Sequence, residues 1–212
     1  MRPLAIIACA ALVTLLGACS QPDKPSVPLY LAMQRSDLDQ IERHIYWGSD
    51  INAALPNGRY PLHIAARKGD IAMVRILLKH GAAIDQITAE GDTALDLAIL
   101  SGRTQAAEFL LQRGAGLDAS ALLLKAAAMG TTDRDTVNFL VAHGANTEQV
   151  DSAGDTPLLI AIRQDNHRLA THLVNKGADV NVKTADGQSA LVLARDLQFP
   201  ELISLLQRQG AR

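Results

Sequence analysis

The chain has 212 residues, of which 48% are apolar and 3% aromatic, and its formal net charge is -2. This length allows one domain with a substantial core, and the shortage of aromatic residues favours close packing of small and medium side chains over one large central core. The sequence has no run rich in Lys and Arg, so it lacks the basic footprint typical of a nucleic-acid-binding protein. We therefore expect no DNA or RNA partner.

Residues 1–18 have the parts of a secretory signal. The positive charge of Arg2 precedes an apolar run from Leu4 to Leu16, which small residues follow. Thirteen helical residues extend only about 20 Å, well short of the roughly 30 Å hydrocarbon core of a bilayer. A transmembrane helix is therefore the weaker interpretation.

The signal ends in Leu16-Gly17-Ala18-Cys19, which resembles the bacterial lipobox. The resemblance implies cleavage before Cys19 and acylation of that cysteine, and several acyl chains give a stable anchor. Since Asp does not follow the cysteine, the pattern also resembles that of lipoproteins sent to the outer membrane, facing the periplasm. The alternative is an ordinary signal peptide cut after Ala18, which would leave a free periplasmic thiol.

The lipidated cysteine and a short linker, residues 19–26, precede the repeats. The linker contains Pro22 and Pro25 and spans only about 20 Å, which predicts a folded part close to the membrane. Because Cys9 lies in the leader, the mature chain has no cysteine pair to oxidise and no cysteine cluster to hold a metal.

From residue 27 to 212 the sequence repeats. A Gly followed by a small residue recurs at intervals of 33, 33, 30, 33 and 33 residues, and a Leu-x-x-Ala step recurs in the same register. A period in this range predicts a solenoid. The marker glycines are Gly48, Gly81, Gly114, Gly144, Gly177 and Gly210. They divide the chain into units of about 27–57, 58–90, 91–118, 119–150, 151–183 and 184–212.

Each unit contains the pattern of two short helices. Tyr60-Pro61 and Thr156-Pro157 place proline at a first helical position, and Gly69 closes the first helix. A second helix from about Ile71 to His80 ends at a marker Gly, where a left-handed cap costs little. A polar segment with a Gly at its tip then predicts a hairpin-like turn. Because such short helices are marginal alone, the units must stack.

The stretch from Arg59 to Asp70 resembles the ankyrin repeat, as do Gly154 to Leu158 and Asn175 to Asn181. The match extends from about Val27 to Arg212. It implies an all-α solenoid of about six stacked helix-turn-helix units with short β-hairpin-like turns, a concave binding surface, and function by protein recognition.

The unit at 119–150 departs from the pattern. Its connection from Gly114 to Leu123 is five residues shorter than the others, and two residues are added between its helices. One interpretation is neutral drift in a tolerant loop, and the other is that the loss of a projecting turn opens a gap for a partner. In the terminal units, His44 and Gln207 replace the Leu of other units and predict polar caps.

All three tyrosines and the only tryptophan fall between residues 30 and 60. Tyr46 and Trp47 take the positions of Lys79 and His80, which predicts exposure on the second helix. Exposed aromatic side chains are typical anchors of an interface. The alternative is that these rings shield the end of the stack beside the linker.

The sequence offers little for catalysis. His63 occupies the position at which the ankyrin resemblance implies a bond to turn backbone, and His80 and His143 lie at helix ends where a cation is mildly favoured. His167 and His172 are five apart and do not share a helix face as metal ligands would. Since no nucleophile elbow, phosphate loop or zinc spacing occurs, we expect a non-enzymatic protein without cofactor or metal.

We expect a monomer that binds a partner protein through its turn tips and its short-helix face. The candidate contacts are Asn57, Arg59 and Glu90 at the tips, Arg67, Lys68, Leu100, Ser101, Arg163 and Gln164 on the short helices, and Tyr46 and Trp47 near the tether. Three uses remain open, namely immunity against a toxin that acts in the periplasm, support of an envelope enzyme such as a catalase, and assembly. An enzyme and a secreted effector are the rival classes.

Overall fold

The computed structural model describes residues 21–56, 58–130 and 133–212. The predicted signal, Cys19 and Asn57 lie outside these ranges. Within them the structure has twelve helices, and its only strand-like pairing is an isolated bridge between Lys183 and Ser189. The all-helical prediction is confirmed. None of these helices has the length and apolarity needed to cross a bilayer.

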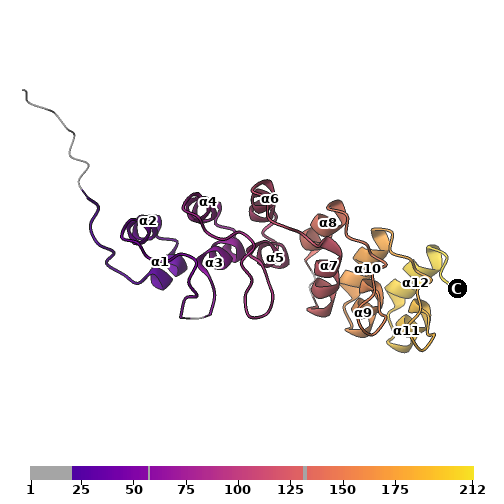
Figure 1. Ribbon diagram of the computed structural model, residues 1–212. Coiled ribbons are helices and arrows are strands. Elements are labelled where there is room, and N and C mark those ends of the chain that lie inside the picture. Colours follow the sequence, from indigo (N-terminus) through magenta and orange to yellow (C-terminus); the bar gives the residue numbers. More distant parts are fainter. Residues whose placement is uncertain (1–20, 57, 131–132) are drawn as a thin grey trace, which may run out of the picture.

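The helices form six antiparallel pairs that stack in chain order into two layers (Figure 1). The inner layer holds α1 (Leu29–Arg35), α3 (Pro61–Lys68), α5 (Ala94–Leu100), α7 (Ala119–Ala128), α9 (Pro157–Arg163) and α11 (Ala190–Asp196). The outer layer holds α2 (Leu38–Tyr46), α4 (Ile71–Lys79), α6 (Thr104–Gln112), α8 (Arg134–Ala142), α10 (His167–Asn175) and α12 (Pro200–Arg208).

Local sequence explains where these helices begin and end. Proline is the first residue of α9, and the hydroxyl of Thr156 before it accepts a hydrogen bond from a first-turn N–H. Asp70 caps α4 in the same way. The six marker glycines have φ between 81° and 93°, a left-handed conformation that costs glycine little, and this lets each outer helix end sharply.

The core is one continuous cluster that runs through all six units. The Ala of each Leu-x-x-Ala step is fully buried between neighbouring inner helices, as at Ala65, Ala98 and Ala161. Because alanine lets helix backbones approach closely, this position explains how a chain with so few aromatic residues packs densely.

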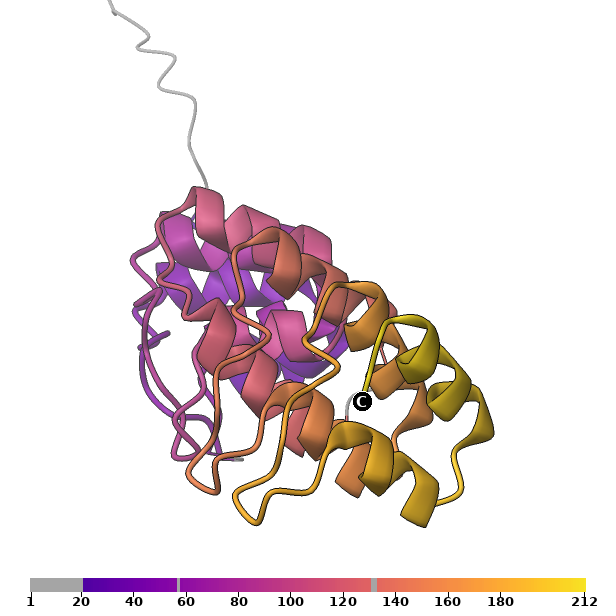
Figure 2. The same cartoon turned by 90° about the vertical axis from the view of Figure 1, so that its right-hand side faces the viewer.

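Four long connections join one unit to the next and project from the helices, and we call them fingers. They are finger 1 (residues 47–60), finger 2 (80–93), finger 4 (143–156) and finger 5 (176–189). Figure 2 shows these loops along one edge of the stack. The third connection, residues 113–118, has only six residues and forms no finger.

The irregular unit compensates for this loss with a longer helix. α7 has ten residues, against seven or eight in the other inner helices, and Asp118 caps its added N-terminal turn. The hydroxyl of Ser120 in that turn accepts a hydrogen bond from the Asn146 N–H of finger 4, at 2.8 Å. The deletion thus removes the finger and keeps the contact between units.

The segment predicted as a linker lies against α2 where the structure describes it. The Ser26 N–H donates to the Gln40 side chain (2.8 Å), and the Arg43 guanidinium lies 3.5 Å from the Asp23 carboxylate. The Nε2 atom of His44 lies 2.7 Å from the Val27 carbonyl oxygen. His44 therefore binds the segment that precedes the first helix, in keeping with its predicted role as a polar cap of the first unit.

Candidate protein-binding surface

His63 fastens finger 2 to α3. Its side chain is 1% exposed, and its Nε2 atom lies 2.9 Å from the Gln86 carbonyl oxygen and 3.2 Å from that of Asp92. Burial lowers the pKa of His63 and favours the neutral ring, although the hydrogen bonds to the two carbonyls have a smaller effect in the opposite direction. Because both carbonyl oxygens accept, the neutral ring carries its proton on Nε2. The predicted structural role of this histidine is confirmed.

A salt bridge closes the base of the same finger from the next unit. The Lys125 ammonium in α7 pairs with the carboxylate of Asp92, whose side chain is largely buried. The equivalent residues of other inner helices are apolar, as at Ile64 and Ile160. Lys125 is therefore the one charged side chain at this position of the inner helices, and it belongs to the unit that follows the short connection.

Arg163 has a corresponding role at finger 4. Its Nε atom lies 3.2 Å from the carboxylate of the buried Asp155, and Nη2 lies 3.9 Å from Asp186 in finger 5. Burial raises the pKa of Asp155 although Arg163 acts in the opposite direction. The guanidinium is about half exposed, so it pairs with the buried acid and still forms part of the solvent-exposed surface of the inner helices.

The predicted tip residues that the structure describes are exposed. Arg59 lies in finger 1 and Glu90 in finger 2. The pKa of Glu90 is lowered by a bond from its own backbone N–H, by the Thr88 hydroxyl and, to a smaller extent, by the charge of Arg59. Fingers 1 and 2 thus carry opposite charges at Arg59 and Glu90.

The predicted short-helix residues have different surroundings. Arg67 is exposed, Leu100 is half-buried against the core, and Ser101 is the C-cap of α5. Lys68 donates to two carbonyl oxygens at the end of α1, Met33 (3.3 Å) and Gln34 (2.7 Å).

Gln164 binds the inner helix before its own, as Lys68 does. Its side-chain amide donates to the Ala128 carbonyl oxygen at the end of α7, at 2.8 Å. Lys68 and Gln164 occupy the same register position in their units, so the stack already uses their polar atoms to hold neighbouring inner helices together.

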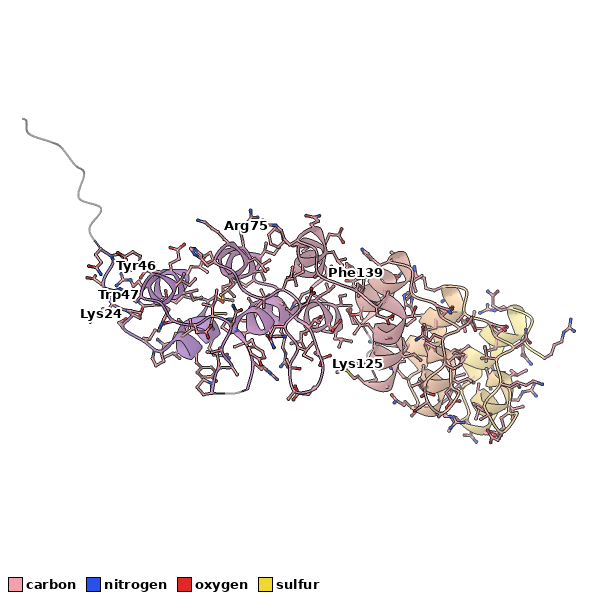
Figure 3. All side chains as sticks on the ribbon, in the orientation of Figure 1. Lys24, Tyr46, Trp47, Arg75, Lys125 and Phe139 are labelled. Atoms are coloured by element: carbon pink, nitrogen blue, oxygen red, sulfur yellow. The ribbon has the colours of Figure 1, made fainter. Side chains whose placement is uncertain are left out.

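Tyr46 and Trp47 are 57% and 39% exposed, as their register predicted. The Trp47 indole N–H donates to the carbonyl oxygens of Pro22 (3.2 Å) and Asp23 (3.3 Å), and the Lys24 ammonium lies 5.3 Å from a ring centroid. Figure 3 shows Lys24, Tyr46 and Trp47 together at the end of the stack. These contacts favour the shielding interpretation for Trp47 and leave Tyr46 the more accessible ring.

The comparisons with known proteins agree with this architecture. A family model for ankyrin repeats (3 copies) matches residues 29–121 and 123–212. The chain belongs to the ankyrin-repeat family. Ankyrin-repeat proteins are generally non-enzymatic protein-binding scaffolds, so the family supports a protein partner.

Several solved ankyrin-repeat structures are similar along most of the chain. The ankyrin repeat domain of Bcl-3, a unique member of the IkappaB protein family, has a TM-score of 0.71 and 26% identity, covering 90% of this chain and 89% of that one. A chain from the complex of the predatory endopeptidase Bd0816 of Bdellovibrio bacteriovorus with immunity protein Bd3460 has a TM-score of 0.67 and 26% identity. That match covers 88% of this chain and 100% of that chain.

Curated relatives match over shorter stretches. An ankyrin repeat-containing protein of Treponema pallidum is 40% identical over 73 residues, which are 34% of this chain and 24% of that protein. The ankyrin repeat protein L271 of Acanthamoeba polyphaga mimivirus is 29% identical over 91 residues, 42% of this chain and 12% of that protein. The chain thus spans about a quarter or less of the length of these relatives.

Three exposed apolar residues near the irregular unit of this ankyrin-repeat stack were not predicted from the sequence. Ile87 (54% exposed) and Val150 (52%) lie in fingers 2 and 4, on either side of the missing finger, and Met129 (62%) ends α7 between them in sequence. Ile87 and Val150 both lie six residues after a marker Gly, where fingers 1 and 5 have Ala54 and Lys183. This shared register is the signal that could have identified them.

Proposed function

We propose that this protein is a lipid-anchored envelope protein that binds a partner protein through its fingers and inner helices, without catalysis. The observation that carries the proposal is the exposure of Ile87, Val150 and Met129 around the unit that lacks a finger. Exposed apolar side chains that lie near one another are typical of protein-binding surfaces, and Ile87 and Val150 lie in the two fingers that border the gap. The missing finger gives a partner access to the inner helices there.

The position of the N-terminal segment supports an anchored protein. Trp47 and Arg43 hold Pro22 and Asp23 against α2, only three to four residues after Cys19. Three extended residues span at most about 11 Å. A lipid on Cys19 would therefore keep the first unit at the membrane, with the later units farther along the stack.

Within this class we favour an immunity protein that neutralises a toxin acting in the periplasm. The structural similarity to a chain from a complex of an endopeptidase with an immunity protein, at 26% identity and over 88% of this chain, supports that choice. Support of an envelope enzyme and assembly are the competing uses, and each has its own phenotype on deletion.

Site-specific photo-crosslinking in intact cells tests the surface. A photoreactive residue at position 87 or 150 should capture one specific protein, because both side chains project from fingers beside the gap. The matched control is Gln105, an exposed residue of the outer helix α6. Equal capture from position 105 would refute the assignment to the finger side.

Two further experiments test the lipid anchor and the proposed immunity function. Mass spectrometry of the mature N-terminus should show an acylated Cys19, and the Cys19→Ser variant should lose the modification and the membrane fraction. Deletion should sensitise cells to a specific envelope-acting toxin. Sensitivity to peroxide alone would favour enzyme support, and altered cell shape or envelope leakage alone would favour assembly.

A further inference from the structure

The last three outer helices, α8, α10 and α12, carry a groove. It has a volume of about 780 Å³ and is lined by residues at α8, α10 and α12, which belong to the outer layer of helices (Figure 1). Three of its lining residues, Arg134, Arg168 and Lys176, are basic, and His172 lies among them.

The positive groups follow one face of α10. Arg168, His172 and Lys176 are spaced four residues apart, which places them on successive helical turns about 6 Å apart. Arg134 lies across from them in α8, where its neighbour one turn on, Asn138, has its side-chain oxygen 3.1 Å from His172 Nε2. The groove is therefore bordered by cations on two sides.

Two acids share this lining, but neither is paired with the basic side chains. Among the described residues, Arg134, Arg168 and Lys176 have no ion pair or hydrogen bond through their side chains. Asp133 also lines the groove, but its carboxylate accepts from the N–H and the hydroxyl of Thr136 (3.0 and 2.7 Å) as the cap of α8.

The remaining titratable groups complete the electrostatic picture. Burial acts to raise the pKa of Asp133, but the hydrogen bonds that its carboxylate accepts outweigh burial and lower that pKa. His167 lies 2.8 Å from Asp165, and Glu201 of α12 is the other acid in the lining. Burial, and then the charges of Lys176 and Arg134, lower the pKa of His172. The lining thus holds three basic side chains against two acids, and the basic side chains have no partner among the described residues.

We propose that this groove binds an extended acidic segment of a partner protein, with carboxylates on alternate residues. In an extended chain, side chains four residues apart lie on one side at about 13 Å, close to the helical rise of about 12 Å from Arg168 to Lys176, and the carboxylate between them would face His172. Carboxylates there can accept charge-assisted hydrogen bonds from Arg168, Lys176 and, across the groove, Arg134. Val137 and Leu169, which are almost fully buried, lie in the floor of the groove. This second surface does not depend on the partner of the fingers.

A defined peptide tests this inference on the full chain in detergent. The probe is a labelled acetyl-Glu-Ala-Glu-Ala-Glu amide at low ionic strength, with the Lys-Ala-Lys-Ala-Lys peptide as the charge control and inorganic phosphate at matched ionic strength as the competitor. We expect the Glu peptide to bind, the Lys peptide not to bind, and phosphate to compete weakly.

Two double variants locate the site. Arg134→Gln with Lys176→Gln should weaken binding at least about tenfold, because two charge-assisted contacts are lost. Arg75→Gln with Lys79→Gln removes two basic side chains from the outer helix α4, outside the groove, and should leave the affinity unchanged. NMR titration should show a raised pKa for His172 in the complex, since a nearby carboxylate favours the charged ring.

Three results would overturn the inference. They are failure of the Glu peptide to bind at low millimolar concentration, an equal loss in the α4 variant, and full competition by phosphate, which would assign the groove to phosphate groups. Crosslinking from position 87 or 150 does not involve these residues, so its outcome is independent of this test.

Discussion

The ammonium of Lys125 in α7 and the carboxylate of Asp92 in finger 2 form a salt bridge between units three and four, across the place where a finger is missing. Replacement of Lys125 by Ile, the residue of other units, leaves a largely buried carboxylate without its partner. We expect Lys125→Ile to lower the free energy of unfolding by about 1–3 kcal/mol, measured by urea denaturation at neutral pH.

The control for this prediction is the double variant Lys125→Ile with Asp92→Asn. Because it removes the unpaired charge, it should recover much of the lost stability. A single variant as stable as the parent protein would contradict the role given to this pair.

Local features of the fold could be predicted from the sequence, because local residues determine them. Pro61 with Gly69, and Thr156 with Pro157, gave the starts and ends of helices to within about one residue. The five-residue deletion after Gly114 predicted a shortened connection. It did not predict that α7 would gain a turn, because that turn is held by finger 4 through Ser120.

The candidate surface was less predictable. The position of a residue in the repeat predicts whether its side chain is exposed, but it does not show which atoms a long side chain contacts. Lys68 and Gln164 were predicted as partner contacts, yet each binds carbonyl oxygens of the preceding inner helix, more than thirty residues away. Arg163 likewise neutralises Asp155. These bonds depend on distances across the stack, which residue spacing alone does not define.

Stability should depend on pH through His63. Its pKa is below 6.5 in the folded chain and about 6.5 when unfolded, so the unfolded chain binds more protons as the pH falls below 6.5. The free energy of unfolding should therefore decrease with falling pH in that range. Urea denaturation at pH 7.5 and 5.5 measures this decrease.

The matched variant for this prediction is His63→Gln. It should be less stable than the parent at pH 7.5 and should show a smaller decrease between the two pH values. His172, whose pKa is also lowered, is present in both proteins and cancels in the comparison. An identical pH dependence in parent and variant would exclude His63 as a contributor.

Within residues 21–56, 58–130 and 133–212, three non-glycine residues adopt left-handed backbone angles between the two helices of a unit, where other units have glycine. Gln198 is one of them, with φ of 60°, and the equivalent Gly102 has φ of 68°. Since a side chain costs about 1–2 kcal/mol in this conformation, Gln198→Gly should raise the melting temperature, with a net gain of roughly 0.5–1 kcal/mol.

The same replacement at Gln207, in the right-handed helix α12, is the control and should cost up to about 1 kcal/mol. The reverse change, Gly102→Ala, should also destabilise the chain, because a Cβ atom there lies 2.8 Å from an Asp133 carboxylate oxygen. If Gln198→Gly and Gln207→Gly shifted the melting temperature alike, backbone strain at Gln198 would be excluded.

Trp47 is the only tryptophan, so its fluorescence reports on the end of the stack beside the N-terminal segment. Replacement of Lys24 by Ala removes the cation near the ring, and Arg43→Ala removes the partner of Asp23. Either change should loosen this segment, shift the emission to longer wavelength and increase acrylamide quenching, while far-UV circular dichroism stays unchanged.

The same measurements distinguish the two interpretations of the aromatic pair. If Trp47 shields the stack, Trp47→Ala should lower the midpoint of urea denaturation and leave partner capture by a crosslinker at position 87 unchanged. Tyr46→Ala, which removes a ring at 57% exposure without a bond to the segment, is the comparison and should have a smaller effect on stability. Loss of capture in either variant without loss of stability would instead assign the pair to the partner interface.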